Sequence, residues 1–163
     1  MRNNSGFTLV ELMTVIGILT LLAAIGLPNF IGWRENAQLG RAARELYSSF
    51  HLAKVSAVRT NQFCTAAFNQ GGYDFVVFVD ADSDLVLDND EQKIAFMSWS
   101  NFGTVSLTGV NFSGSPGDAV GFAPDGLPRN NSGNLTSGSV NLRNKKGKTI
   151  SLNLTLAGGV AIQ

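Results

Sequence analysis

The chain has 163 residues, among them twelve basic and twelve acidic side chains and one cysteine, so its formal net charge is zero. A zero net charge excludes a protein-wide positive field that would attract nucleic acid, and a single cysteine excludes an internal disulfide. The residues after the apolar N-terminal segment are numerous enough for one compact domain.

The N-terminal segment is the most apolar part of the chain. A polar leader, residues 1–6, precedes an apolar run from Phe7 to Leu27 in which Glu11 is the single charged residue. As a helix, this run would span about 31 Å, enough to cross a bilayer core. Secretory signals have shorter apolar regions, and their cleavage site follows that region. Here the plausible processing site, Gly6, precedes the run, so we expect residues 7–27 to remain in the mature protein as a transmembrane or filament-core helix.

Glu11 is an unusual residue for such a segment. A carboxylate inside a membrane costs about 2.5–3.5 kcal/mol on insertion scales, and it normally has a partner. Cleavage after Gly6 would create a positively charged amino terminus at Phe7, four residues before Glu11. The amine of one copy could therefore neutralise the carboxylate of a neighbouring copy.

The segment Gly6-Phe7-Thr8-Leu9-Val10-Glu11 resembles the class III signal of type IV prepilins. The resemblance implies that prepilin peptidase cuts after Gly6, that the new N-terminal Phe7 is N-methylated, and that Glu11 pairs with the terminal amine of a neighbouring subunit. Pro28 also matches the family, in which this proline bends or locally melts the helix. The alternative is an ordinary signal anchor with a stray glutamate, which would require none of these residues.

The segment after Pro28 has the pattern of an amphipathic helix. Apolar residues recur at spacings of 4, 3, 4, 3 and 4, which is one face of an α-helix: Leu39, Ala43, Leu46, Phe50, Ala53 and Ala57. We predict one long helix from Phe7 to about Thr60 with a disturbance near Pro28. Its amphipathic half, residues 28–60, is expected to pack on a sheet. A coiled coil is the alternative, but the run is short and rich in alanine.

The remaining residues, 61–163, have the composition of a β-rich globular domain. β-Branched and aromatic runs bounded by Gly, Asn and Asp predict strands at 63–68, 73–79, 93–99, 104–112, 120–123, 140–143, 148–156 and 160–163. Residues 127–138 are predicted to form an exposed loop. One N-terminal helix packed on antiparallel sheets is an α+β, pilin-like fold.

Three later segments narrow the resemblance to the minor pseudopilin H and FimT-type minor pilin group: Leu52–Asn61 followed by a cysteine-bearing strand, Gly121–Gly126, and Leu156–Val160. This group implies a structural subunit that prepilin peptidase processes and that an inner-membrane platform assembles with other pseudopilins or pilins, near the filament tip. Arg2 favours a cytoplasmic N-terminus and a periplasmic domain. The expected machine is a type II secretion system for protein export, and the alternative is a type IV pilus, with DNA uptake among its roles.

An acidic segment from Asp80 to Glu91 holds six of the twelve acidic residues. Counted from Asp80, its carboxylates at positions 1, 3, 5, 9 and 12 have the spacing of a twelve-residue calcium loop: Asp80, Asp82, Asp84, Asp88 and Glu91. Leu85 occupies position 6, where such loops have a glycine. The segment therefore predicts either a Ca²⁺ site or a solvated acidic hairpin loop, and the structural role requires no cofactor.

The C-terminal part of the chain is basic. No acidic residue follows Asp125, and five basic residues do: Arg129, Arg143, Lys145, Lys146 and Lys148. A clustered basic face can bind nucleic acid. The resemblance implies, however, that DNA-binding FimT-like pilins use an arginine after the last glycine, and Gly159–Gln163 contains none. We interpret these residues as solubilising and do not expect DNA binding.

The sequence contains no motif of an enzyme. It has no nucleophile elbow, phosphate loop, CxxC or HExxH. His51, the single histidine, lies in the predicted helix, and the flanks of Cys64 predict a buried strand thiol rather than a nucleophile. We expect a structural protein.

Overall fold

The computed structural model describes residues 7–115 and 118–163. Gly6, the predicted cleavage site, lies outside the described residues. The chain forms two compact units, Met1–Arg34 and Glu35–Gln163. Both contain part of one helix, α1, which is continuous from Leu9 to Thr60. The disturbance predicted near Pro28 therefore does not interrupt the helix.

The α1 residues of the first unit have apolar side chains on every side. Large apolar residues from Phe7 to Trp33 are exposed, with relative accessibilities between 47% and 84%. An 18-residue window of α1 has a mean hydropathy of 2.3, and none of it is buried inside the protein. By length and composition this helix can cross a membrane. A helix that is apolar all round needs an apolar environment that its own chain does not provide here.

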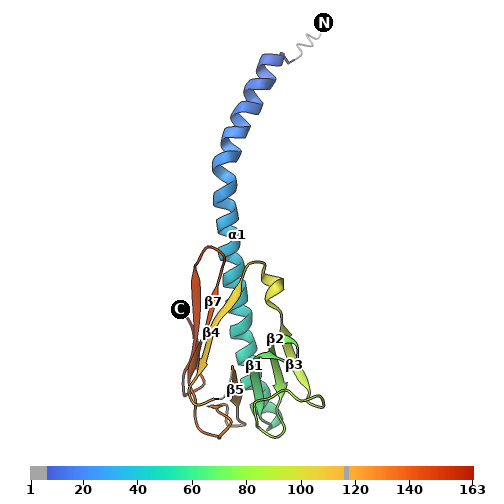
Figure 1. The fold of residues 1–163 in the computed structure, drawn as a ribbon, viewed down its shortest axis with the longest axis vertical. Coiled ribbons are helices and arrows are strands. Elements are labelled where there is room, and N and C mark those ends of the chain that lie inside the picture. The colour runs from blue at the N-terminus through green and yellow to red at the C-terminus, as the bar shows by residue number, and fades with distance from the viewer. Residues whose placement is uncertain (1–6, 116–117) are drawn as a thin grey trace. The chain divides into compact units, whose positions relative to one another are not determined.

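The second unit contains two antiparallel sheets (Figure 1). The five-stranded sheet has the order β3-β2-β1-β5-β6, with bounds β1 Cys64–Gln70, β2 Tyr73–Val79, β3 Lys93–Met97, β5 Ala119–Phe122 and β6 Pro128–Arg129. The four-stranded sheet has the order β4-β7-β8-β9, with bounds β4 Ser106–Phe112, β7 Gly138–Arg143, β8 Thr149–Leu154 and β9 Val160–Ile162. The predicted α+β, pilin-like fold is confirmed.

Two predicted segments differ from the structure. The strand expected at 93–99 ends at Met97, because a 3₁₀ helix, η1, begins at Trp99 and ends at Phe102. The loop expected at 127–138 contains β6, in which Pro128 pairs with Phe122 of β5 and is buried. A two-residue strand is too short to show an alternating pattern, so only its partner strand reveals it.

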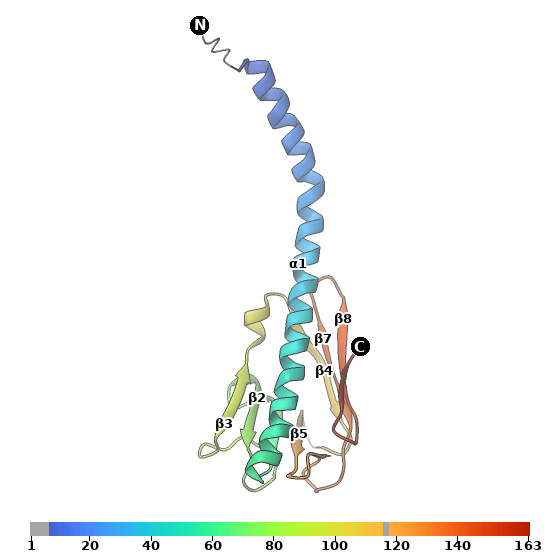
Figure 2. The same ribbon diagram turned by 180° about the vertical axis from the view of Figure 1, so that it is seen from behind.

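The second half of α1 packs against both sheets (Figure 2). All six residues of the predicted apolar face are buried, with accessibilities of 1% or less. The ring of Phe50 lies 5.9 Å from that of Phe75 in the five-stranded sheet and 6.4 Å from that of Phe112 in the four-stranded sheet. Rings at these separations and steep angles attract one another beyond the effect of their burial. The helix-on-sheet packing is confirmed, and Phe50 connects the two sheets.

Phe50→Ala is expected to lower the free energy of unfolding by about 3–5 kcal/mol, because it leaves a cavity where helix and sheets meet. Urea unfolding of the full chain in detergent measures the change. The control is Val55→Ala on the same helix, since Val55 is 56% exposed; it should change the free energy by less than about 0.5 kcal/mol. Similar losses in the two variants would contradict the central role of Phe50.

Candidate functional site

Glu11, the predicted assembly residue, caps the start of α1. Its Oε2 accepts hydrogen bonds from the backbone N–H and the hydroxyl of Thr8, both at 2.9 Å, and its own N–H donates to Thr8 Oγ1 at 3.3 Å. This reciprocal pair is a capping box, which satisfies backbone donors that the first helical turn leaves free. The predicted site omitted Thr8, although a threonine three residues before a glutamate is the sequence signal of such a box.

The capping box leaves Glu11 able to accept another donor. Both side-chain bonds use Oε2, and within residues 7–115 and 118–163 no donor is recorded for Oε1. The hydroxyls of Thr14 and Thr20 donate to backbone carbonyls four residues earlier, so they are satisfied inside the helix. The carboxylate therefore has one oxygen, Oε1, that can accept a further donor.

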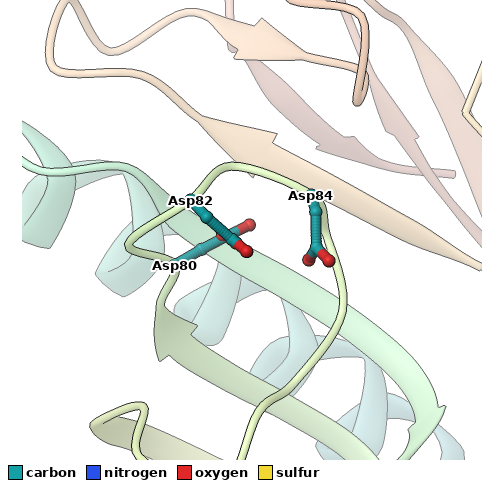
Figure 3. A group of neighbouring side chains, drawn as sticks. All are labelled: Asp80, Asp82 and Asp84. Carbon is teal, nitrogen blue, oxygen red and sulfur yellow. The ribbon is translucent and has the colours of Figure 1, made fainter.

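The predicted calcium ligands lie in the loop between β2 and β3. Single carboxylate oxygens of Asp80, Asp82 and Asp84 lie within 4.8 Å of one another (Figure 3). Asp80 is buried, whereas Asp82 and Asp84 are exposed. These three carboxylates could share one cation with oxygen ligands. Calcium binding by them stays a prediction.

The other two predicted ligands have a different place in the loop. The Glu91 carboxylate accepts the N–H of Ala81 through Oε1 and the N–H of Asp88 through Oε2, each at 3.0 Å. Partial burial raises the pKa of Glu91 above its usual value. Glu91 therefore connects the two ends of the loop, and Asp88 contributes a backbone donor to that connection.

Asp80 is the structural centre of this loop. Its Oδ2 accepts the Thr65 hydroxyl at 2.7 Å and the Leu85 N–H at 3.0 Å, and its Oδ1 accepts the Ser83 N–H at 2.7 Å. Burial raises the pKa of Asp80, and the hydrogen bonds from Thr65, Leu85 and Ser83 partly oppose that rise. A buried carboxylate with three donors joins the loop to β1, an arrangement that the spacing of acidic residues did not indicate.

Leu85 shows why the loop does not need the glycine of a calcium loop. Its backbone is left-handed, with φ of 67°, and its side chain is buried at 1% accessibility. The side chain packs with a small cluster on the sheet face opposite α1: Ala67, Val76, Phe78 and Ala119. A left-handed leucine costs about 1–2 kcal/mol, and burying its side chain contributes about 1.5–3 kcal/mol. The loop is therefore a cover for the second face of the five-stranded sheet.

The predicted basic residues do not form one surface. Arg129, in β6, makes an ion pair with Asp125 at 2.6 Å. The other four basic residues lie at or beside the turn between β7 and β8, in the other sheet. Asn144 in that turn donates to Asn36 of α1, whereas Gly126, near Arg129, lies beside Val58 of the same helix. Asn36 and Val58 are separated by about 33 Å of helix.

Cys64 and His51 have no arrangement that suggests catalysis. Cys64 is fully buried in β1, as predicted, and burial raises the pKa of its thiol to about 11. A thiol with such a pKa is protonated at neutral pH and is a poor nucleophile. His51 is exposed on α1, with its ring 4.7 Å from that of Tyr47.

Comparison with known proteins gives two family matches. Residues 42–159 match the model of the family described as type II transport protein GspH. Residues 1–27 match the prokaryotic N-terminal methylation motif. The two matches together cover the first half of α1 and nearly all of the second unit.

Curated relatives come from two kinds of machinery. The pilin-like protein PilA1 of Thermus thermophilus is 34% identical over 53% of this chain and 55% of its own length. The type II secretion system core protein G of Aeromonas hydrophila is 34% identical over 39% of this chain and 45% of its own. The major pilin PilA of Myxococcus xanthus is 41% identical over 31% of this chain and 23% of its own. The chain thus spans about a quarter to a half of these relatives, and no solved structure matched it.

Asp80→Asn is expected to lower the free energy of unfolding by about 1–3 kcal/mol, because the amide nitrogen cannot accept the buried N–H of Leu85. Thermal or urea unfolding of the full chain measures the loss. Asp90→Asn, an exposed residue of the same loop, removes the same charge and should change stability by less than about 0.5 kcal/mol. Equal stability of the two variants would show that Asp80 does not hold the loop.

Proposed function

The chain belongs to the GspH family of type II transport proteins, and we propose that it is a structural minor pseudopilin of a type II secretion system. The observation that carries the proposal is the match to this family over residues 42–159 combined with the N-terminal methylation motif over residues 1–27. Pilins and pseudopilins are structural subunits rather than enzymes. The proposed activity is therefore assembly into a filament that supports protein export.

Maturation would begin at the N-terminus. The methylation motif supports cleavage by prepilin peptidase after Gly6 and N-methylation of Phe7. Before assembly, the apolar part of α1 would store the subunit in the inner membrane, with its N-terminus in the cytoplasm and its globular unit in the periplasm. The length and hydropathy of that part of the helix support the anchor.

Assembly would move the same helical segment from lipid to a bundle of helices. That transfer provides little hydrophobic driving force, because lipid tails are as apolar as leucine side chains, so packing and polar contacts must select the partner. Glu11 supplies such a contact: its carboxylate would bind the amino terminus of a neighbouring subunit and set the axial register. Pro28 belongs to the same proposed assembly segment, and the inner-membrane platform would carry out the transfer.

The proposal also includes a position near the filament tip and a type of machine, the secretion system. The match to the GspH family supports a secretion pseudopilus. The pilin relatives support the alternative, a FimT-like minor pilin of a type IV pilus. Genes for a secretin, an ATPase and other pseudopilins beside this gene would favour secretion, whereas a pilus gene cluster would favour the alternative.

Gly6→Ala is expected to block the removal of residues 1–6, because the proposed peptidase cuts after a glycine. Immunoblotting of cells that express the chain with and without prepilin peptidase measures the conversion of precursor to the shorter form. Ser5→Ala, one residue earlier, is the control and should be processed normally. A normally shortened Gly6→Ala product would refute the leader assignment.

Glu11→Ala and Glu11→Gln are both expected to reduce incorporation into the filament severalfold while membrane insertion stays intact. Glutamine keeps an acceptor for the capping box but removes the charge, so it separates amine binding from helix capping. Membrane fractionation and the amount of subunit in sheared filaments measure the two steps. Normal incorporation of Glu11→Gln would mean that capping, rather than charge pairing, is the role of Glu11.

A further inference from the structure

We propose that the turn between β7 and β8 binds the anionic lipid headgroups of the membrane in which the subunit is stored. This basic turn consists of four exposed cations: Arg143, Lys145, Lys146 and Lys148. The inference rests on the proposed membrane anchor, and it assigns the globular unit a second, electrostatic contact with the same membrane.

The basic turn is held in a defined conformation. Asn144, at its centre, is buried at 3% accessibility, and its Nδ2 donates to Oδ1 of Asn36 on α1 at 3.0 Å. Its Oδ1 accepts the N–H of Lys148 at 2.9 Å, and its backbone carbonyl accepts the N–H of Gly147 at 3.0 Å. The cations are therefore attached to an ordered backbone, so binding a surface does not require the turn to fold first.

The bond to Asn36 places the basic turn at the end of the second unit where the chain enters it. This unit begins at Glu35, and Leu27, the last residue of the apolar run, is nine residues before Asn36. Nine residues reach about 32 Å at most, even when fully extended. The anchor therefore holds the turn near the membrane surface whatever the arrangement of the two units.

The neighbouring elements do not cancel the charge of the basic turn. The adjoining part of α1 carries two arginines, Arg41 and Arg44, and two glutamates, Glu35 and Glu45. The segment after η1 reaches α1 at Gln38, beside Gly103. Residues 98–106 contain no charged side chain, and Asp74 of β2 accepts the N–H of Trp99. The four cations of the basic turn outnumber the one carboxylate, Asp74, that these neighbours leave unbalanced.

The acidic loop lies at the other end of the unit. The loop from Asp80 to Glu91 is joined to Phe63, just after α1 ends, by the bond from the Asp80 N–H to the Phe63 carbonyl. Asn36 and Thr60 are separated by about 36 Å of helix. The second unit is therefore polarised, with the basic turn at the end where α1 enters it and the acidic loop at the other end. Each lysine near an anionic bilayer surface favours the bound state by about fivefold.

A lipid surface fits this arrangement better than DNA does. Tight DNA binding needs many phosphate contacts along a duplex. Arg129, the remaining basic residue of the C-terminal part, lies in the other sheet and is paired with Asp125. The four cations of one small turn instead match a planar anionic surface that the anchor already brings near.

The test uses the full chain reconstituted into bilayers of phosphatidylcholine alone or with 30% phosphatidylglycerol, both containing a lipid with a nitroxide on its headgroup. A fluorophore is attached at Thr149→Cys, beside the basic turn, or at Asn89→Cys, in the acidic loop; both positions are exposed. Cys64 is fully buried, and labelling of the unsubstituted chain measures how much fluorophore attaches to it. Quenching of each fluorophore measures its proximity to the headgroups.

We expect strong quenching at position 149 only in the anionic bilayers, with its loss at high salt, and weak quenching at position 89 in both. Lys145→Gln with Lys146→Gln should weaken the headgroup contact by about 30-fold. The matched control, Arg59→Gln with Lys93→Gln, removes the same charge from exposed positions elsewhere and should leave the quenching unchanged.

Equal quenching at position 149 in the two bilayers would overturn the inference, and so would equal effects of the two double variants. It would also be overturned if the chain shifted duplex DNA in a gel at 150 mM salt and the variant with both lysines replaced did not. Co-flotation with the bilayers is measured in the same samples. A chain that fails to float refutes the membrane anchor and with it the proposed function, whereas a chain that floats without lipid-dependent quenching refutes the basic turn alone.

Discussion

The burial of one face of α1 in the second unit is the interaction on which the rest of the structure depends. The two sheets are not hydrogen-bonded to each other within the described residues, and each would expose an apolar face without a cover. Phe50 meets aromatic rings from both sheets, and Leu39, Leu46 and Ala53 extend that contact along the helix. The helix that would anchor the subunit is therefore also the element that unites its globular unit.

The same helix satisfies two different physical demands. After Arg34 it is apolar on the face that the sheets cover, whereas its large apolar side chains from Leu9 to Trp33 are exposed. The first demand is met by folding, and the second can be met only by lipid or by other subunits. Since exchanging lipid for protein provides little hydrophobic gain, a polar group such as Glu11 can decide which neighbour is chosen and at which register.

The globular unit has its acidic loop and its basic turn at opposite ends, a separation of charge that the zero net charge of the whole chain conceals. The acidic loop is part of the architecture, because Asp80 and Leu85 hold it against the face of the five-stranded sheet that α1 does not cover. The basic turn is fixed by Asn144 to the opposite part of α1. Both charged segments are thus placed by buried neighbours, and their separation along the helix is larger than a Debye length, so each presents its own sign of charge to its surroundings.

Patterns that extend over a few neighbouring residues were sufficient to predict much of this protein. The apolar run, the 3.6-residue repeat from Leu39 to Ala57 and the alternation of the strands each follow from backbone geometry, which acts locally. The α+β class and the GspH-type resemblance followed from those patterns and from short motifs. Only the tertiary structure decided the strand order, the pairing of β6 with β5, the burial of Asp80 and the distance between Arg129 and the basic turn. These features depend on which distant segments meet, and that is determined by the packing of side chains across the core rather than by the spacing of residues along the chain.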